Sequence, residues 1–553
     1  MPEGVRVTFL GGLGEIGRNC AVIEQEGRLL VLDCGVMFPD PEMPGVDLVL
    51  PDFSFLRENA ERIDAIVLTH GHEDHVGGLS YLLAELSAPV YGSALTLGLA
   101  RGRVEEAGLL GRASFITVAD GERRRIGVFD VEFIPVTHSV PNGFATAFHT
   151  PQGVILHSGD FKLDLTPVDN RRTDLARIGA IASNEGIRLL LADSTNVEEP
   201  GYTQSERTVG ESLRVIFSEH RDHRIIVACF ASHIHRIQQL CDAAIANNRK
   251  VALLGRSMLR NVALARELGL LHVDGRHFVD VENVDELPPG EVCVISTGSQ
   301  GEPMSALALL ASGENRRLSA SEGDVVVLSS HAIPGNEWAV AKVMDGLARR
   351  GAEVVHSGIA YVHESGHAKR GELQTLLSIA RPNCFIPVHG EYRHLLAHAR
   401  LAIEMGVAPD RVLLCEDGDV ISLDEKGIDF AGEVPAGYLF VDGIVGDIGH
   451  GVLRDRRLLA EEGLIVVILA VDLHTGDIIT GPEIMTRGWV HADEGEAILD
   501  EARAEVTKAV GQAVESGSWD QDTLRRVVRR AVGRLVSERT RRRPMIVPVV
   551  MEA

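Results

Sequence analysis

The chain lacks any apolar run long enough to cross a membrane. A transmembrane helix needs ~20 consecutive apolar residues, whereas the longest apolar run, Leu464–Val471, has the length of a β-strand. The first residues also lack the basic segment followed by an apolar segment that a secretory signal requires. We therefore expect a cytoplasmic protein without a membrane partner.

Paired cysteines and an excess of basic residues are missing as well. The seven cysteines are odd in number, scattered, and include no Cys-x-x-Cys pair, which is typical of reduced, mostly buried cytosolic thiols. Lys and Arg number 54 against 79 Asp and Glu, so the formal net charge is −25. This charge argues only weakly against a polyanionic ligand, because metals or a local basic stripe reverse the field where the ligand binds.

The 553 residues are too many for one hydrophobic core, and we expect two or three domains. From about residue 208 to 359, helical stretches alternate with apolar strands, the pattern of βαβ units in a parallel sheet. The strands are expected at 224–228, 251–254, 292–295 and 325–328.

A third region follows residue 432. We expect strands around 464–473 and 545–550 and helices over about 494–514 and 521–537. The second helix is rich in arginine, which indicates a solvated face, an RNA-backbone contact or a subunit interface. Its arginines are Arg525, Arg526, Arg529, Arg530 and Arg534.

Three histidines and one aspartate cluster in the segment Leu68-Thr69-His70-Gly71-His72-Glu73-Asp74-His75-Val76-Gly77. The apolar run before it, 63–68, predicts a buried strand, so the histidines project from a strand-to-loop corner. In extended backbone His70 and His72 face the same way and suit one metal, while Asp74 and His75 turn onward and suit a second. The alternative is a histidine-rich surface loop without a metal.

Four more candidates for a metal centre stand where strands end. Asp33 ends a strand and is placed to hold the histidine loop by hydrogen bonds. His138, Asp160 and His389 each follow an apolar strand. A single His or Asp at a strand end is more often structural, but the histidine cluster favours metal ligands here. Because His389 follows the alternating region, that region is predicted to be a domain inserted into the metal-binding one.

A glycine-rich stretch near the start matches a dinucleotide-binding fingerprint only in part. Residues 12–17 read Gly-x-Gly-x-x-Gly after the predicted strand 5–10. The fingerprint requires a helix next, whereas residues 20–33 have the pattern of a hairpin that turns at 26–28. We therefore do not expect a nucleotide cofactor.

These motifs resemble the metallo-β-lactamase superfamily, and the insertion narrows the resemblance to the β-CASP nucleases of the ribonuclease J family. The stretches that carry it are GGLGEIGRN at 11–19, ADSTN at 192–196, FASHIHR at 230–236, TGSQGEP at 297–303, HESGH at 363–367 and PVHGE at 387–391.

The resemblance covers essentially the whole chain and implies an α/β fold in three parts. A metallo-β-lactamase αββα sandwich is interrupted by an inserted β-CASP domain with a parallel sheet, and a small α+β C-terminal domain follows a linker. The expected boundaries are 1–207 and 361–432 for the sandwich, 208–360 for the insertion, 433–447 for the linker and 448–553 for the C-terminal domain.

The resemblance also implies the metal ligands. Two divalent ions per subunit are expected, zinc in the first place and manganese as the alternative. Asp160 would lie between them, and Asp33 would orient the histidines. The remaining ligands would be His70, His72 and His138 for one ion and Asp74, His75 and His389 for the other.

The catalytic and substrate-binding residues are implied in the same way. Asp74, Asp193 and His367 would serve catalysis, with Asp74 directing the attacking water and His367 protonating the leaving 3′ oxygen. A 5′-phosphate would be held by Ser232, His363, Ser365, Gly366 and His367. The chain departs from the family at Glu364, where relatives often carry a small or apolar residue, and we expect that carboxylate to point to solvent.

The implied activity is metal-dependent hydrolysis of single-stranded RNA in RNA maturation and mRNA decay, by 5′-to-3′ exonuclease action that favours 5′-monophosphate ends and by endonuclease action. The implied partners are single-stranded RNA, a second copy in a homodimer or tetramer, and proteins of RNA degradation. Three alternatives remain: a β-CASP DNA nuclease, a hydrolase of small esters or thioesters, and a binding scaffold with a degenerate metal site. The insertion disfavours the second, and the complete set of ligand positions disfavours the third.

Overall fold

The computed structural model describes residues 4–40, 42–333, 335–443, 446, 448–472, 474–489, 492–517 and 520–552. Leu473, where a strand was expected to end, and residues 444, 445 and 447 of the predicted linker lie outside the described residues. The chain divides into two compact units, Met1–Phe38 with Val49–Tyr438 and Pro39–Leu48 with Leu439–Ala553. The division falls inside the predicted linker, but the grouping of Pro39–Leu48 with the C-terminal residues was not predicted.

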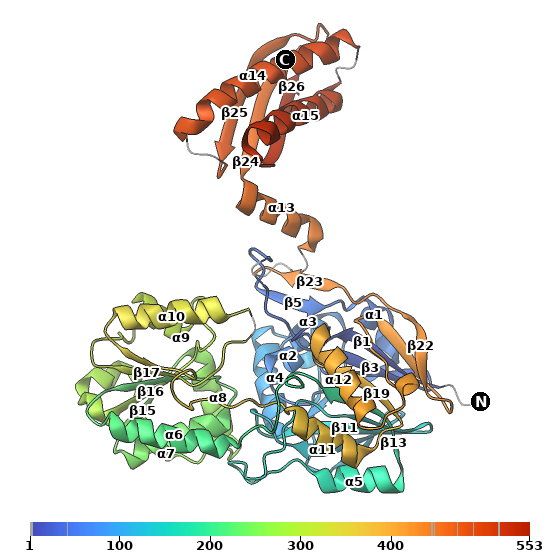
Figure 1. The fold of residues 1–553 in the computed structure, drawn as a ribbon, viewed down its shortest axis with the longest axis vertical. Helices are drawn as coiled ribbons and strands as arrows, with labels where there is room; N and C mark the ends of the chain where they lie inside the picture. Colours follow the sequence, from blue (N-terminus) through green and yellow to red (C-terminus); the bar gives the residue numbers. More distant parts are fainter. Residues whose placement is uncertain are drawn as a thin grey trace. The chain divides into compact units, whose positions relative to one another are not determined.

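Two β-sheets pack face to face in the first unit (Figure 1). One has eight strands, in the order β22 (Ile428–Glu433), β21 (Asp419–Leu423), β1 (Val5–Gly11), β3 (Cys20–Gln25), β4 (Arg28–Leu32), β6 (Ile63–Val67), β7 (Val90–Gly92) and β8 (Phe115–Thr117). The other has six, in the order β19 (Cys384–Val388), β13 (Ile187–Asp193), β12 (Gly153–His157), β11 (Gly143–Thr150), β10 (Phe129–Val136) and β9 (Arg123–Ile126).

Alternate strand residues explain this packing, because successive side chains point to opposite faces of a sheet. Val7, Val131 and Leu189 lie in the core between the two sheets. Leu190 points the other way, into a second core against the outer helices. The helices α5 (Leu175–Asn184), α11 (Arg370–Ala380) and α12 (Tyr392–Glu404) supply that core, while α4 (Ala94–Glu106) contacts β7 and β8 of the eight-stranded sheet and α3 (Leu79–Glu85) contacts α4. The αββα sandwich is confirmed.

β19 proves that the alternating region is an insertion. It pairs in parallel with β13, from Leu189↔Cys384 to Asp193↔Val388, although the whole alternating region lies between them in the sequence. The short strands β2 (Leu13–Gly14) and β20 (Gly390–Glu391) also pair in parallel. Residues from both ends of the sandwich sequence therefore meet at one edge.

The insertion contains a five-stranded sheet in which all neighbours are parallel, as predicted. Its order is β15 (Lys250–Leu254), β16 (Val292–Ser296), β14 (Ile225–Ala228), β17 (Val325–Leu328) and β18 (Glu353–Val355), of which β18 was not predicted. The strands are mostly apolar because helices cover both faces; Lys250 and Glu353, which begin β15 and β18, are exposed. In Figure 1 these are α6 (Glu206–Glu219), α7 (Ile234–Ala246) and α8 (Arg256–Glu267) on one face, and α9 (Ala306–Ser312) and α10 (Glu337–Arg349) on the other.

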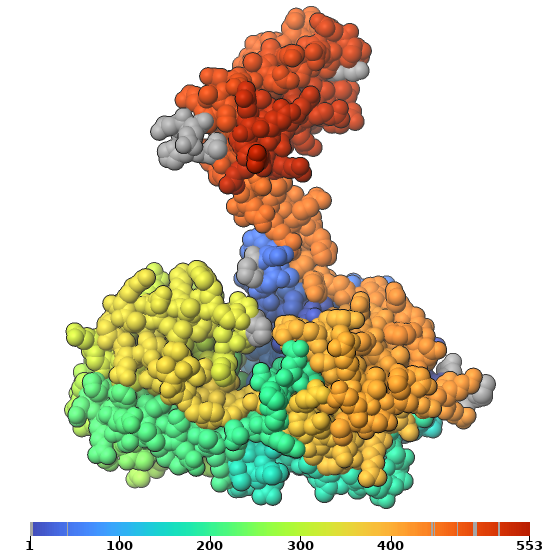
Figure 2. Space-filling model, viewed as in Figure 1, coloured from blue at the N-terminus to red at the C-terminus, as the bar shows by residue number. Residues whose placement is uncertain are grey.

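The hairpin predicted near the start is confirmed. β3 and β4 pair antiparallel from Ala21↔Leu32 to Gln25↔Arg28, so no helix follows the glycine-rich stretch and a dinucleotide fingerprint is excluded. Further short elements are α1 (Ser54–Glu58), α2 (Glu73–Val76), β5 (Leu48–Pro51) and β23 (Tyr438–Val441). Figure 2 shows a hollow between the insertion, in yellow, and the sandwich, in orange, on the face drawn there.

The second unit contains a three-stranded sheet, ordered β25 (Ile478–Arg487), β24 (Leu464–Val471) and β26 (Met545–Glu552). Alternate residues of β24, among them Val467 and Leu469, pack against α14 (Ala492–Glu515) and α15 (Gln521–Thr540). α13 (Gly449–Glu462) precedes the sheet. Among the described residues, no helix has both the length and the apolar character needed to cross a membrane.

Candidate metal centre

All seven predicted ligands converge in two groups that share one residue. His70, His72, His138 and Asp160 form the first, and Asp74, His75, Asp160 and His389 the second; in each, the ligand atoms lie within 4.8 Å of one another. The ligands follow the ends of four strands: β6 precedes the histidine loop, which supplies four of them, β10 precedes His138, β12 precedes Asp160 and β19 precedes His389.

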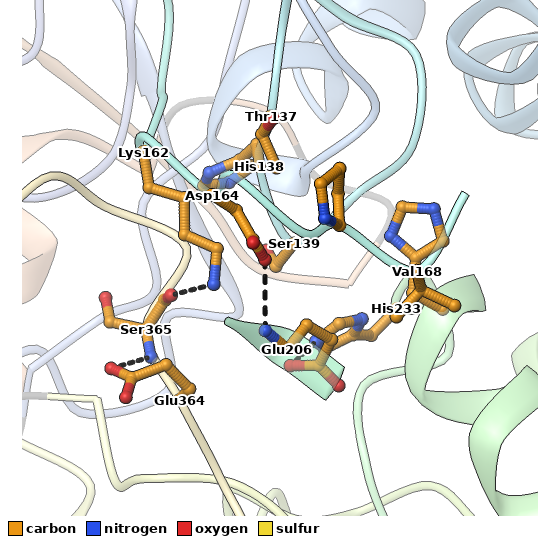
Figure 3. A pocket seen from close by; sticks show the side chains of 12 residues that line it. Thr137, His138, Ser139, Lys162, Asp164, Val168, Glu206, His233, Glu364 and Ser365 are labelled. Atoms are coloured by element: carbon orange, nitrogen blue, oxygen red, sulfur yellow. Dashed lines mark hydrogen bonds and ion pairs between the residues drawn. The ribbon is translucent and has the colours of Figure 1, made fainter. Parts of the chain in front are cut away.

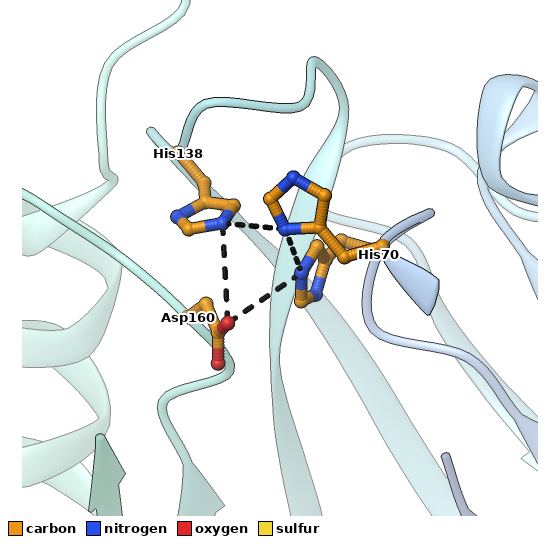
Figure 4. A group of neighbouring side chains, drawn as sticks. His70, His138 and Asp160 are labelled. Atoms are coloured by element: carbon orange, nitrogen blue, oxygen red, sulfur yellow. Dashed lines mark hydrogen bonds and ion pairs between the residues drawn. The ribbon is translucent and has the colours of Figure 1, made fainter. Parts of the chain in front are cut away.

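Asp160 faces both groups with a single oxygen. Its Oδ2 lies 3.1 Å from Nε2 of His389 and 3.2 Å from Nε2 of His75, and 3.6 Å from Nε2 of His70. Figure 4 shows this carboxylate beneath the rings of His70 and His138. A carboxylate oxygen in this position suits a ligand shared by two cations.

The protonation states of the first ligand group fit a divalent ion. Burial lowers the pKa of His72 to about 4 and holds the pKa values of His70 and His138 well below the usual range, so these rings are neutral. Burial opposes ionisation of Asp160, yet the imidazoles of His389 and His75 hold its pKa well below the usual value. Neutral imidazoles and ionised carboxylates are the forms that bind metal, and mixed nitrogen and oxygen donors fit zinc or manganese. In the second group burial lowers the pKa of His389, but the charge of Asp160 raises it overall to about 10, so a metal ion that binds there displaces a proton.

Asp33 orients the histidine loop directly. Its carboxylate accepts hydrogen bonds from the backbone N–H of Thr69 at 2.7 Å, from the Thr69 hydroxyl at 2.8 Å and from Nδ1 of His75 at 2.8 Å. Holding Nδ1 leaves Nε2 of His75 facing Asp160. This is the position that the sequence indicated for Asp33.

The backbone of the histidine loop is held from the glycine-rich stretch, which the sequence did not predict. Asn19 donates from its backbone N–H and its amide Nδ2 to the carbonyl of Asp74, at 3.0 and 3.1 Å. At Gly35 an added Cβ would lie 1.6 Å from the same carbonyl oxygen, so a side chain there would displace the loop.

Arg18 is a second residue that the sequence analysis missed. Its side chain is fully buried, and the guanidinium donates to Glu15 at 2.7 Å, to Asp417 at 2.8 Å and to the carbonyl of Gly437 at 3.0 Å. The only signal in the sequence is a charged residue inside a glycine-rich stretch. Its partner Asp417 lies too far along the chain for a pattern to connect them.

Asp193 and His367 form a pair beside the metal ligands. Nδ1 of His367 lies 2.8 Å from Oδ2 of Asp193, and the His367 ring centre is 5.0 Å from that of His138 and 5.5 Å from that of His389. Burial lowers the pKa of His367, but the charge of Asp193 and the hydrogen bond to it raise that pKa overall.

A small pocket adjoins the centre (Figure 3). Its lining includes His138, Ser139, Lys162, His233, Glu364 and Ser365. Of the predicted phosphate-binding residues, Gly366 is adjacent, since its carbonyl lies 2.8 Å from Nδ1 of His138. Ser232 and His363 are not among the described residues that line the pocket; the His363 ring lies 4.9 Å from that of His331.

Glu364 corrects the sequence-based expectation. Its carboxylate does not point to solvent: the residue is 8% exposed and lines the pocket. Oε1 accepts a hydrogen bond from the backbone N–H of Ser365 at 3.0 Å, and Oε2 accepts one from the Tyr361 hydroxyl. Two donors of its own loop hold the side chain inside.

Fold and centre together define a metal-binding hydrolase of the metallo-β-lactamase class with a β-CASP insertion. The family models that match are the metallo-beta-lactamase superfamily over residues 13–197, the ribonuclease J beta-CASP domain over 222–347, a Zn-dependent metallo-hydrolase RNA specificity domain over 351–412 and the ribonuclease J C-terminal domain over 451–553. The chain belongs to the ribonuclease J family.

Individual relatives match from end to end. Ribonuclease J2 of Bacillus subtilis is 41% identical over all of this chain and 99% of its own length. Ribonuclease J of Mycolicibacterium smegmatis is 42% identical over 100% of this chain and 98% of its own, and that of Mycobacterium tuberculosis H37Rv is 44% identical over 99% and 97%. A crystal structure of an Enterococcus faecalis protein of unknown function covers 76% of this chain and 100% of its own at 17% identity and a TM-score of 0.54, and therefore supports the fold alone.

Proposed function

We propose that the protein is a two-metal phosphodiesterase that hydrolyses single-stranded RNA. The observation that carries this proposal is the single Asp160 oxygen facing two separate ligand groups. Hydrolysis of a phosphodiester develops charge on the non-bridging oxygens, and a pair of cations is suited to stabilise it. Family membership points to RNA as the polymer.

We assign His70, His72 and His138 to one ion and Asp74, His75 and His389 to the other, with Asp160 shared. When bound, divalent ions supply Lewis acidity that lowers the pKa of water and neutralises phosphate charge; zinc suits the donors best, with manganese as the alternative.

Residues of the chain itself direct the attacking water and protonate the leaving group. Oδ2 of Asp74 lies 3.5 Å from Nε2 of His389, inside the centre, where it can accept a hydrogen bond from the attacking water and direct it. His367, protonated through Asp193, donates a proton to the leaving 3′ oxygen. Asp33 keeps His75 in the orientation that the centre needs.

The pocket beside His138 is the proposed site of the RNA 5′-phosphate. From the family resemblance we assign Ser232, His363, Ser365 and Gly366 to the phosphate. Of these four, Ser365 lines the pocket, next to the positive charge of Lys162. A phosphate held there, next to the metal centre, sets the chain end in register and gives 5′-to-3′ release of nucleotides. Internal cleavage requires RNA to enter, from the side, the hollow between the insertion and the sandwich (Figure 2).

The proposal also includes a homodimer and a cytoplasmic location. Its domain boundaries are 1–207, 208–360, 361–432 and 448–553. A feature of the C-terminal unit supports self-association: the face of its sheet that bears Val466 and Ile468 is opposite the helices, and it carries the exposed side chains of Met485, Val547 and Met551. An exposed apolar face of this kind is suited to contact a second copy.

The test is digestion of one unstructured sequence as 5′-monophosphate RNA, 5′-triphosphate RNA and DNA by the purified protein. We expect fast release of nucleotides from the first, slow release from the second and little from the third. Equal rates on RNA and DNA would contradict the substrate, and equal rates on both RNA ends would contradict the 5′-phosphate pocket. The double variant Ser232→Ala with His363→Ala should lose the end preference.

A further inference from the structure

An acidic side chain of the protein itself, Glu364, lines the pocket beside the metal centre. Figure 3 shows the Glu364 carboxylate turned back onto the backbone N–H of Ser365. The Tyr361 hydroxyl donates to its other oxygen. A carboxylate and a terminal phosphate seek the same donors, so Glu364 satisfies groups that an incoming phosphate would use.

Two cations near Glu364 already have hydrogen-bond partners of their own. Lys162 donates to the carbonyls of Gln204 and Ser365, at 3.0 and 3.2 Å, and so lies against the Glu364 loop. Arg236, fully buried, is paired with both oxygens of Glu206. A phosphate that enters beside Glu364 therefore meets a carboxylate in the same pocket, and two anions repel at short range.

We propose that Glu364 is an internal competitor for the 5′-phosphate site: the 5′-phosphate of an RNA binds only after the Glu364 carboxylate releases the N–H of Ser365. This inference rests on the proposed function. It names Glu364 as the residue that sets how strongly this enzyme prefers a phosphorylated 5′ end. Because an intramolecular competitor loses no translational freedom when it binds, the Glu364 carboxylate weakens the binding of the 5′-phosphate. It does not block the metal centre.

The inference predicts a gain of function. Glu364→Gln removes the charge and keeps the volume, and Glu364→Ala removes both the charge and the competing oxygens. The measurement is kcat/KM for nucleotide release from 5′-monophosphate and 5′-hydroxyl versions of one unstructured RNA. We expect the ratio of the two values to rise about tenfold for Glu364→Ala, the effect of one interaction of ordinary strength, and less for Glu364→Gln. The rise should appear as a lower KM at constant kcat, since the phosphate is bound equally before and during the reaction.

Glu353→Gln is the matched control, because it removes an exposed carboxylate that does not line the pocket and should leave the ratio unchanged. A ratio that stays constant or falls in both Glu364 variants, while 5′-hydroxyl RNA is still cleaved, overturns the inference. Loss of 5′-hydroxyl cleavage in both variants also overturns it, because Glu364 would then belong to the catalytic centre. If wild type cleaves neither RNA, the proposed function itself fails, which is a separate result.

Discussion

His367 donates its Nδ1 hydrogen to Asp193 across 2.8 Å, and the pair stands against the rings of His138 and His389. Burial lowers the pKa of His367, whereas the charge of Asp193 and its hydrogen bond raise it above the ordinary value. Asp193 therefore keeps the imidazole protonated up to higher pH. A general acid that protonates a leaving oxygen needs that form.

The first prediction is a shift in the pH–rate profile. If protonated His367 is the acid, the rate falls as pH rises through the pKa of His367. Asp193→Asn removes the charge that raises this pKa, so the falling limb of kcat should move to lower pH. His367→Ala should lower kcat by ~10²–10⁴ and remove the limb. An unchanged limb in Asp193→Asn, measured with equal metal content, would assign the proton to another group.

The second prediction concerns the metal ligands. His72→Ala and Asp74→Ala should each lower turnover by several orders of magnitude with little effect on RNA affinity, because each deletes a ligand of the preorganised centre. Elemental analysis should show less bound metal in both. His367→Ala is the contrast, since it should retain all metal; a loss of metal there would make His367 a ligand. Chelation of wild type should abolish cleavage, and zinc or manganese should restore it.

The sequence predicted what local patterns encode. The histidine loop and the polar residues at the ends of β10, β12 and β19 were recognisable because strand ends and ligand spacing are properties of short segments. The structure brings these ligand candidates together. The parallel sheet was equally visible, since its buried strands are continuous apolar runs.

What the sequence did not predict depends on contacts between distant segments. Arg18 and Asp417 form an ion pair although almost the whole sandwich sequence separates them. No pattern in either segment predicts this contact. The prediction that the Glu364 side chain points to solvent was wrong. The Ser365 N–H and the Tyr361 hydroxyl, both in the same loop, hold the carboxylate inside by hydrogen bonds. A charged residue in a loop is usually solvated, and only tertiary packing reverses that preference.

The third prediction separates chemistry from assembly. Removal of the residues after 446 should leave cleavage of a dinucleotide nearly unchanged, because every proposed ligand lies in the first unit. The same truncation should lower the sedimenting mass or weaken the binding of long RNA. Val547→Glu, which charges the apolar sheet face, should reproduce the change in mass, whereas Arg529→Ala with Arg530→Ala on α15 should affect only RNA binding. Loss of dinucleotide cleavage by a folded truncated protein would contradict the separation.

The last prediction is that Arg18 stabilises the metal centre through the neighbouring residue Asn19. Its fully buried guanidinium binds Glu15, Asp417 and the Gly437 carbonyl, and the next residue, Asn19, holds the Asp74 carbonyl. Arg18→Met leaves two carboxylates without their cation, which should lower the free energy of unfolding by ~3–5 kcal/mol. The same variant should weaken metal affinity ~10–100-fold, because the loop that carries Asp74 loses its support.

The control for Arg18 is Arg28→Met, since Arg28 makes a comparable pair with Asp64 but is 38% exposed. We expect this variant to lose less than ~1 kcal/mol of the free energy of unfolding in urea and to keep its metal affinity.

The pH dependence of stability adds a test with a defined direction. Burial and the charge of Glu15 raise the pKa of Asp417 to about 7, so the stability associated with its neutral form is present at low pH and is lost as pH rises through about 7. The Arg18→Met defect should therefore be largest above pH 7 and shrink on acidification, and Asp417→Asn in the same background should remove this dependence. A defect that grows as pH falls, or one no larger than that of Arg28→Met, would show that the buried guanidinium does not brace the centre.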